Sequence, residues 1–186
     1  AGDCFGRRVD GAGDVDADGY ADLIVGASTD DDNGTNCGSA RVFSGKDGST
    51  LYTFYGDSAG DQFGRSVAGA GDVDADGYDD VVVGLGRVTV LSGKDGSVIY
   101  ELLGTNGSVA GAGDVDKDGF PDVVVGKAKD ADDMGHAYVY SGKDGSTLFT
   151  LKGDSAGDGF GWAVSCAGDV NVDGKPDLIV GARNDD

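Results

Sequence analysis

The chain has 186 residues, enough for one domain with a buried core, and 36 of them are glycine. Asp and Glu number 34 against 14 Lys and Arg, which gives a formal net charge of −20 at pH 7. This charge argues against binding to nucleic acid or to an anionic membrane surface. No apolar run approaches the ~20 residues of a membrane span, so we expect no membrane insertion. The abrupt start at "AGDCFG" suggests a mature or trimmed product.

The first predicted unit begins with a glycine-rich strand that leads into an acidic loop over residues 14–22. The apolar strand "LIVGA" follows, and then a third strand, "SARVFSG", the turn "GKDGS" and a fourth strand, "TLYTFYG". Lys-Asp-Gly between two β-rich runs is typical of a hairpin, because the glycine can adopt positive φ. No window of the sequence has a helical period, so the predicted fold is all-β.

The same unit recurs along a single domain, residues 1–186. The expected repeats are residues 5–62, 63–104, 105–159 and the partial repeat 160–186. The strand after each acidic loop is a continuous apolar run, which predicts burial on both faces between stacked sheets. Radially repeated four-stranded units are typical of a β-propeller. The second unit lacks the long loop after its apolar strand, and the third carries Thr105 and Asn106 where the others carry Phe-Gly.

Each acidic loop places an oxygen-bearing side chain at its first, third, fifth and ninth positions. Glycine at the sixth position permits a sharp turn, and the backbone carbonyl of the seventh can point inward. Ca²⁺ takes about 6–8 oxygen ligands, so we expect about four calcium ions per chain. An EF-hand does not fit, because that loop lies between helices and ends with Glu; a metal-free acidic turn is the alternative. The expected ligands, loop by loop, are Asp14, Asp16, Asp18, Tyr20 and Asp22; Asp72, Asp74, Asp76, Tyr78 and Asp80; Asp114, Asp116, Asp118, Phe120 and Asp122; and Asp169, Asn171, Asp173, Lys175 and Asp177.

Paired Phe-Gly residues followed by a line such as "GAGDVDADGYADLIVGA" resemble the FG-GAP repeat of integrin α-subunit propellers. The resemblance covers essentially the whole chain, although the proline of the family's name is absent. It implies a seven-bladed propeller with calcium on one face and ligand-binding loops on the other. The chain would then hold about 3.5 four-stranded blades, half of such a ring. The near-identity of the copies favours a bacterial integrin-like protein or a consensus-like sequence.

We therefore expect a calcium-stabilised, extracellular adhesion or protein-interaction module that is not an enzyme. A half-propeller leaves sheet faces and edges open, so we expect a homo-oligomer: a dimer that completes the ring, or a filament. A four-bladed single-chain propeller and a fragment of a longer protein are alternatives to assembly. A glycan-binding lectin-like propeller and an accessory domain of a secreted hydrolase are alternative functions. In each case a protein or glycan ligand is expected at the upper-face loops.

Three cysteines without CxxC spacing argue against a zinc or redox motif. Cys4 and Cys37 both fall in loop-like sequence of the first repeat, and we expect them to form a disulfide, which would suit an extracellular location. Cys166 occupies a position that is glycine in the sister repeats. A small buried thiol is the expectation there.

Among the other side chains, Phe5, Phe63 and Phe160 are expected to be core wedges between blades. Trp162 replaces Arg or Gly of the sister repeats and is a packing residue, a sugar platform or an interface anchor. His136 is the sole histidine and is expected to be solvated. No Ser, His or Asp constellation for catalysis is visible.

Three acidic runs, residues 29–33, 129–133 and 183–186, occupy the same loop of three blades. They are either solvated loops or an upper-face surface for a basic partner or further cations.

Overall fold

The computed structural model describes residues 2–85, 87–102, 107–129 and 133–185. Within these ranges the chain forms three four-stranded antiparallel sheets and one two-stranded sheet. The strands are β1 (Arg8–Gly13), β2 (Asp22–Ala27), β3 (Ser39–Phe43) and β4 (Thr50–Tyr55); β5 (Ser66–Gly71), β6 (Asp80–Leu85), β7 (Arg87–Leu91) and β8 (Val98–Leu102); β9 (Val109–Gly113), β10 (Asp122–Lys127), β11 (His136–Tyr140) and β12 (Thr147–Lys152); and β13 (Phe160–Gly168) and β14 (Asp177–Ala182). The all-β prediction is confirmed.

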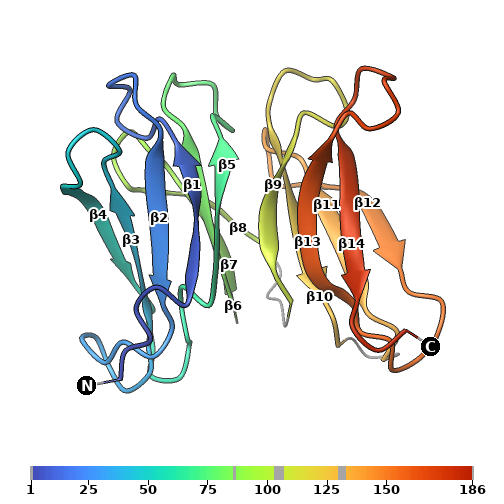
Figure 1. The fold of residues 1–186 in the computed structure, drawn as a ribbon, viewed down its shortest axis with the longest axis horizontal. Helices are drawn as coiled ribbons and strands as arrows, with labels where there is room; N and C mark the ends of the chain where they lie inside the picture. The colour runs from blue at the N-terminus through green and yellow to red at the C-terminus, as the bar shows by residue number, and fades with distance from the viewer. Residues whose placement is uncertain (1, 86, 103–106, 130–132, 186) are drawn as a thin grey trace.

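Each sheet is a simple meander whose spatial order follows the chain order. The first strands β1, β5, β9 and β13 contact one another in series, and the sheets fan out from them as blades (Figure 1). The acidic loops between the first and second strands all lie at one end of the sheets, at the top of Figure 1. The expected boundary between residues 104 and 105, with Thr105 and Asn106, lies outside the described residues.

Buried apolar side chains fill the space between consecutive sheets, in three clusters within the described chain. On β6, Val81 and Val83 face the cluster shared with the first sheet, while Val82 faces the cluster shared with the third. The continuous apolar run is therefore buried on both faces in the inner blades, as the sequence predicts.

The two end sheets depart from this prediction. Leu23 on β2 is 49% exposed and Ile179 on β14 is 60% exposed, because no sheet of the described chain covers their outer faces. For the same reason the three phenylalanines expected as core wedges differ in burial. Phe63 is buried and Phe160 half-buried, whereas Phe5 is 55% exposed. The prediction that Phe5 is a core wedge is wrong; its ring makes an edge contact with Phe43 instead.

The structure corrects two expectations about cysteine. Cys4, Cys37 and Cys166 are all free, so the predicted Cys4–Cys37 disulfide is wrong. Cys37 is fully buried with its Sγ 3.5 Å from the backbone oxygen of Asp30, while Cys4 is exposed. Cys166 is half-buried instead of buried, because its strand β13 belongs to an end sheet with one covered face.

The glycines of the first strands are required by close backbone approach. A Cβ built on Gly69 would lie 2.7 Å from the carbonyl oxygen of Gly11, and one on Gly111 would lie 2.7 Å from that of Gly69. Real Cβ atoms do not come this close to backbone oxygens, so any side chain would push adjacent blades apart. Gly11 itself, on the outer face of the first sheet, has nothing within 4 Å of its Cβ position.

We expect Gly69→Ala to lower the free energy of unfolding by about 1–3 kcal/mol through overpacking between β1 and β5. Gly11→Ala is the matched control, and it should be neutral or slightly stabilising because its Cβ enters open space. Urea unfolding of both variants in the same buffer measures the difference. Equal stability of the two variants would contradict this account of blade spacing.

Candidate metal centres

In the first acidic loop, backbone N–H groups donate hydrogen bonds to carboxylates of the same loop. The backbone N–H groups of Asp18 and Gly19 donate to the two carboxylate oxygens of Asp14, each at 2.9 Å. The N–H of Tyr20 donates to Asp18 Oδ1 at 3.0 Å. The other three loops repeat this pattern of hydrogen bonds. The four loops therefore share one set of internal hydrogen bonds.

Two positions of each loop adopt left-handed backbone conformation. The sixth is glycine, as predicted, with φ of 89° at Gly19. The fourth is not glycine: φ is 56° at Ala17 and 60° at Val172. A non-glycine residue there costs on the order of 1 kcal/mol, a strain that the surrounding hydrogen bonds must offset.

The ninth aspartate links the loop to the rest of its blade. Asp22 is buried and accepts hydrogen bonds from the N–H groups of Val15 at 2.7 Å and Gly45 at 2.9 Å. Gly45 begins the turn between the third and fourth strands. The Asp22 carboxylate therefore connects the acidic loop to that turn. Asp80 and Asp122 make the equivalent bonds in the next two blades. Sequence reasoning gave this residue a metal-binding role only.

The structure brings carboxylates of the first three loops together, close enough to share an ion. One oxygen from each member of a group lies within 4.8 Å of the others in the sets Asp14, Asp16 and Asp18; Asp72, Asp74 and Asp80; and Asp114, Asp116 and Asp122. The fourth loop has Asn171 at its third position and keeps the same fold, with the N–H of Asp173 3.0 Å from Asp169 Oδ1. The inward carbonyls at the seventh positions stay a prediction.

A lysine accompanies each of the first three loops, and sequence reasoning missed it. Lys46 Nζ lies 3.4 Å from Asp18 Oδ2 and 5.7 Å from the centre of the Tyr20 ring. Lys94 and Lys143 hold the same positions in the next two blades. The signal was present in the sequence: the "GKDGS" turn occurs in the three units that have a complete blade.

Adjacent loops also touch one another through their eighth residues. Asp79 Oδ2 accepts a hydrogen bond of 2.7 Å from the N–H of Asp14 in the preceding blade. In the later blades Pro121 and Pro176 occupy this position, against Gly71 and Gly113. The acidic loops are thus part of the contact between blades.

Burial and mutual repulsion raise the pKa of several loop carboxyls. Burial raises the pKa of Asp80 to about 7, with smaller contributions from Asp74 and Asp72, against the N–H groups of Gly93 and Val73 that lower it. Burial and the charge of Asp76 likewise raise the pKa of Asp74. A cation among these groups would remove the cost of ionising them at neutral pH.

In the metal-free protein, we expect the free energy of unfolding to fall as the pH rises from about 4 to about 7. The pKa of Asp80 in the folded state, about 7, lies above its ordinary value of 3.8, so the folded chain keeps a proton that the unfolded chain releases. One such group changes stability by about 1.4 kcal/mol per pH unit within this interval. Carboxyls with lowered pKa, such as Asp47 beside Ser49, titrate below about pH 4 and do not contribute to this slope.

Thermal melts in EDTA across this range measure the slope, and Asp80→Asn should flatten it. A metal-free stability that increases over the same interval would contradict the assignment.

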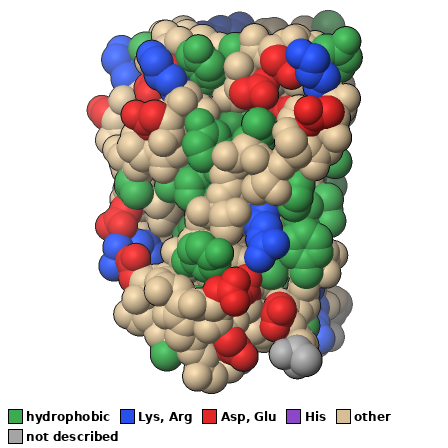
Figure 2. Space-filling model, turned by 90° about the vertical axis from the view of Figure 1, so that its left-hand side faces the viewer, with side chains coloured by type: hydrophobic (Ala, Val, Ile, Leu, Met, Phe, Trp, Pro, Cys, Tyr) green, Lys and Arg blue, Asp and Glu red, His purple; other side chains and the backbone are tan. Residues whose placement is uncertain are grey.

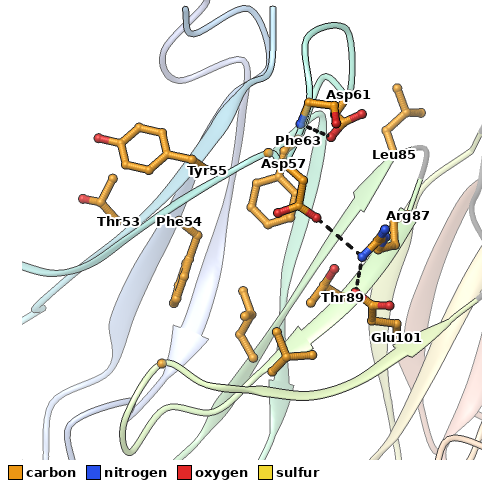
Figure 3. Close-up of a pocket in the computed structure, with 15 residues that line it drawn as sticks. Thr53, Phe54, Tyr55, Asp57, Asp61, Phe63, Leu85, Arg87, Thr89 and Glu101 are labelled. Atoms are coloured by element: carbon orange, nitrogen blue, oxygen red, sulfur yellow. Dashed lines mark hydrogen bonds and ion pairs between the residues drawn. The ribbon is translucent and has the colours of Figure 1, made fainter. Parts of the chain in front are cut away.

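A groove between the first two blades lies away from these loops. It has a volume of about 580 Å³ and is lined by β4, the loop after it, β7 and β8. Arg87 is one of the lining residues, with Nη1 3.5 Å from Asp57 Oδ2 and hydrogen-bonded to Glu101 (Figure 3).

The two remaining side chains singled out in the sequence are both in ring contacts. Trp162 is 42% exposed, and the guanidinium of Arg183 lies 4.5 Å from the centre of its ring. His136 stacks on Tyr138 with ring centres 5.8 Å apart. One face of the Trp162 ring is therefore covered, and a role as a sugar platform stays a prediction.

Taken together, fanned four-stranded blades with an acidic loop between the first two strands define a β-propeller whose loops could hold metal ions. Comparison with known proteins agrees. Residues 5–43 match the FG-GAP repeat and residues 114–180 match the FG-GAP-like repeat. The chain is therefore built from FG-GAP repeats.

Two known proteins are similar over part of their length. Integrin alpha-6 from Gallus gallus is 33% identical in a 90-position alignment that covers 43% of this chain and 8% of the integrin. The crystal structure of the rhamnogalacturonan lyase YesW superposes with a TM-score of 0.56 and 20% identity, over 92% of this chain and 39% of the lyase. This chain thus spans a small part of each relative, and the lyase shares the fold alone.

Proposed function

We propose that this chain is a calcium-stabilised, integrin-like propeller module that acts by binding a partner outside the cell and not by catalysis. The observation that carries the proposal is the recurrence of a preformed carboxylate cluster in successive blades, each at the contact between sheets. The distant similarity to integrin alpha-6 supports the same role. The described residues contain no helix long and apolar enough to cross a membrane.

Calcium is the ion that suits these loops best. All side-chain ligands are hard oxygens, and each cluster is irregular and crowded with carboxylates, whereas Mg²⁺ prefers a strict octahedron with several waters. Extracellular modules use calcium with affinities of about 10⁻⁴–10⁻³ M, because the ion is abundant there. Calcium binding of this kind favours an extracellular location even though Cys4 and Cys37 form no disulfide.

Calcium removal should lower the melting temperature strongly. Each site stabilises the folded state by about 2.7 kcal/mol when calcium is at 100 times its dissociation constant, and each kcal/mol is worth about 2–4 °C in a chain of this size. Differential scanning calorimetry with calcium and with EDTA measures the shift. Asp74→Asn should reduce the calcium-dependent part, while Asp10→Asn, an exposed carboxylate on β1, should not. A melting temperature indifferent to EDTA would contradict the proposal.

The partner we propose is a second copy of this chain, in contact with the open faces of the end sheets. The outer face of the first sheet exposes Phe5, Val9 and Leu23, and Figure 2 shows hydrophobic side chains gathered across this side of the molecule. The outer face of the last sheet exposes Trp162 and Ile179. Exposed apolar surface of this kind favours association.

The contact between copies is proposed to be face to face. The last sheet contains only the first two strands of a blade, and β14 has no third strand beside it among the described residues. Two such half-blades joined edge to edge would place a first strand at an outer rim, which does not continue a propeller. A first sheet packed on the last sheet of another copy continues it, either as a closed ring or as a filament.

Light scattering in millimolar calcium should give a mass near twice that of the 18.6 kDa chain. Leu23→Asp, which places a charge on the open face without touching a buried cluster, should return the protein to a monomer; Asp10→Asn is the control. Larger masses that depend on concentration would favour the filament. A monomer in the unsubstituted protein would contradict assembly with a second copy.

A further inference from the structure

A further group of carboxylates lies outside the four acidic loops. Asp154 and Asp158 are in the connection between β12 and β13, and Asp185 follows β14; one oxygen from each lies within 4.8 Å of the others. The connection between β12 and β13 and the end of the chain lie at the opposite end of the sheets from the acidic loops (Figure 1). The three aspartates line a hollow of about 260 Å³ together with Lys152 and Phe160.

One member of this group, Asp158, has a buried carboxylate oxygen without a hydrogen-bond partner. Asp158 is 8% exposed, and the unpartnered oxygen is its Oδ2. Burial, the side-chain interaction with Asp154 and the charge of Asp185 raise the pKa of Asp158, and the backbone N–H of Ser155 opposes them only in part. Native proteins rarely leave a buried carboxylate oxygen unsatisfied, because its lost hydration is not replaced. A bound cation or a proton would satisfy this oxygen of Asp158.

The backbone holds the two segments together independently of any ion. The N–H of Asn184 donates to the backbone oxygen of Asp158 at 2.8 Å, and its side-chain Nδ2 donates to the oxygen of Gly157 at 3.0 Å. These bonds place Asp185 next to the connection after β12. The hydrogen bonds of Asn184 therefore hold the carboxylate of Asp185 close to those of Asp154 and Asp158.

The chain contains its own comparison for this site. The sequence "GDSAGD" occurs at residues 56–61 and again at 153–158. In the first copy, Arg87, just beyond the second strand of the following blade, lies 3.5 Å from Asp57. In the second copy, the residue that approaches from the corresponding segment is Asp185, an acid in place of a base.

We propose that Asp154, Asp158 and Asp185 bind a divalent cation with a preference for hard oxygen ligands, Ca²⁺, in the place that Arg87 fills in the earlier blade. Arg183 does not fill this place, since its guanidinium lies over the Trp162 ring. Lys152 lines the same hollow and competes with the ion. The exposed carboxylates of Asp154 and Asp185 leave room for water to complete the coordination.

Backbone amide NMR during a calcium titration tests this site separately from the acidic loops. In the unsubstituted protein the signals of Gly157, Asp158 and Asn184 should shift with saturation, as those of the acidic loops do under the proposed function. Shifts in the loops without shifts here would overturn this inference and leave the proposed function intact. Shifts of Gly157, Asp158 and Asn184 without shifts in the acidic loops would support this inference and overturn the proposed function.

The decisive variant is Asp158→Asn, which should weaken calcium binding at this place about tenfold or more by removing one charged ligand. Asp61→Asn is the matched control in the first "GDSAGD" copy, and it should leave the response at Gly157 and Asn184 unchanged. Asp185→Asn, at an exposed position, should give the same loss without risk to folding. An unchanged titration in both Asp158→Asn and Asp185→Asn would overturn the proposal in favour of a shared proton.

Discussion

In the three four-stranded blades, the buried aspartate at the ninth position of the acidic loop makes the contact on which the blade depends. Its two carboxylate oxygens accept N–H groups from the start of the loop and from the turn between the third and fourth strands, as Asp80 does with Val73 and Gly93. The loop, the apolar strand and the hairpin therefore share one anchor. Burial alone would disfavour the ionised form of that anchor, so the backbone N–H groups and a nearby cation are needed to stabilise it.

The same requirement explains how charge is distributed over a chain with a formal charge of −20. At two kinds of place a basic side chain lies beside closely spaced carboxylates: Lys46 beside Asp18, and Arg87 beside Asp57 and Glu101. These residues neutralise only part of each cluster. The remaining carboxylates of the first three acidic loops lie close enough together to hold metal ions, and these loops lie where neighbouring sheets meet.

Burial of a sheet, in turn, requires a sheet on each side. The inner strands satisfy this condition through glycines such as Gly69, whose lack of a side chain lets backbones approach. The end sheets satisfy it on one side only, and the same apolar pattern that forms a core in β6 leaves Leu23 and Ile179 exposed. The outer faces of the first and last sheets of the described chain are therefore uncovered.

The sequence by itself determined the features that each repeat carries locally: the four strands, the acidic loops with their sixth-position glycine, and the hairpin turns. These depend on residues a few positions apart, so the pattern is readable in the one sequence. Only the tertiary structure decided what depends on neighbours in space. It separated Cys4 from Cys37, exposed Phe5 and half-exposed Cys166, paired Lys46 with an acidic loop of its own blade, and brought Asp185 to Asp158. The physical reason is that a repeated motif encodes one blade, whereas burial and charge pairing depend on which sheet or loop lies next to it.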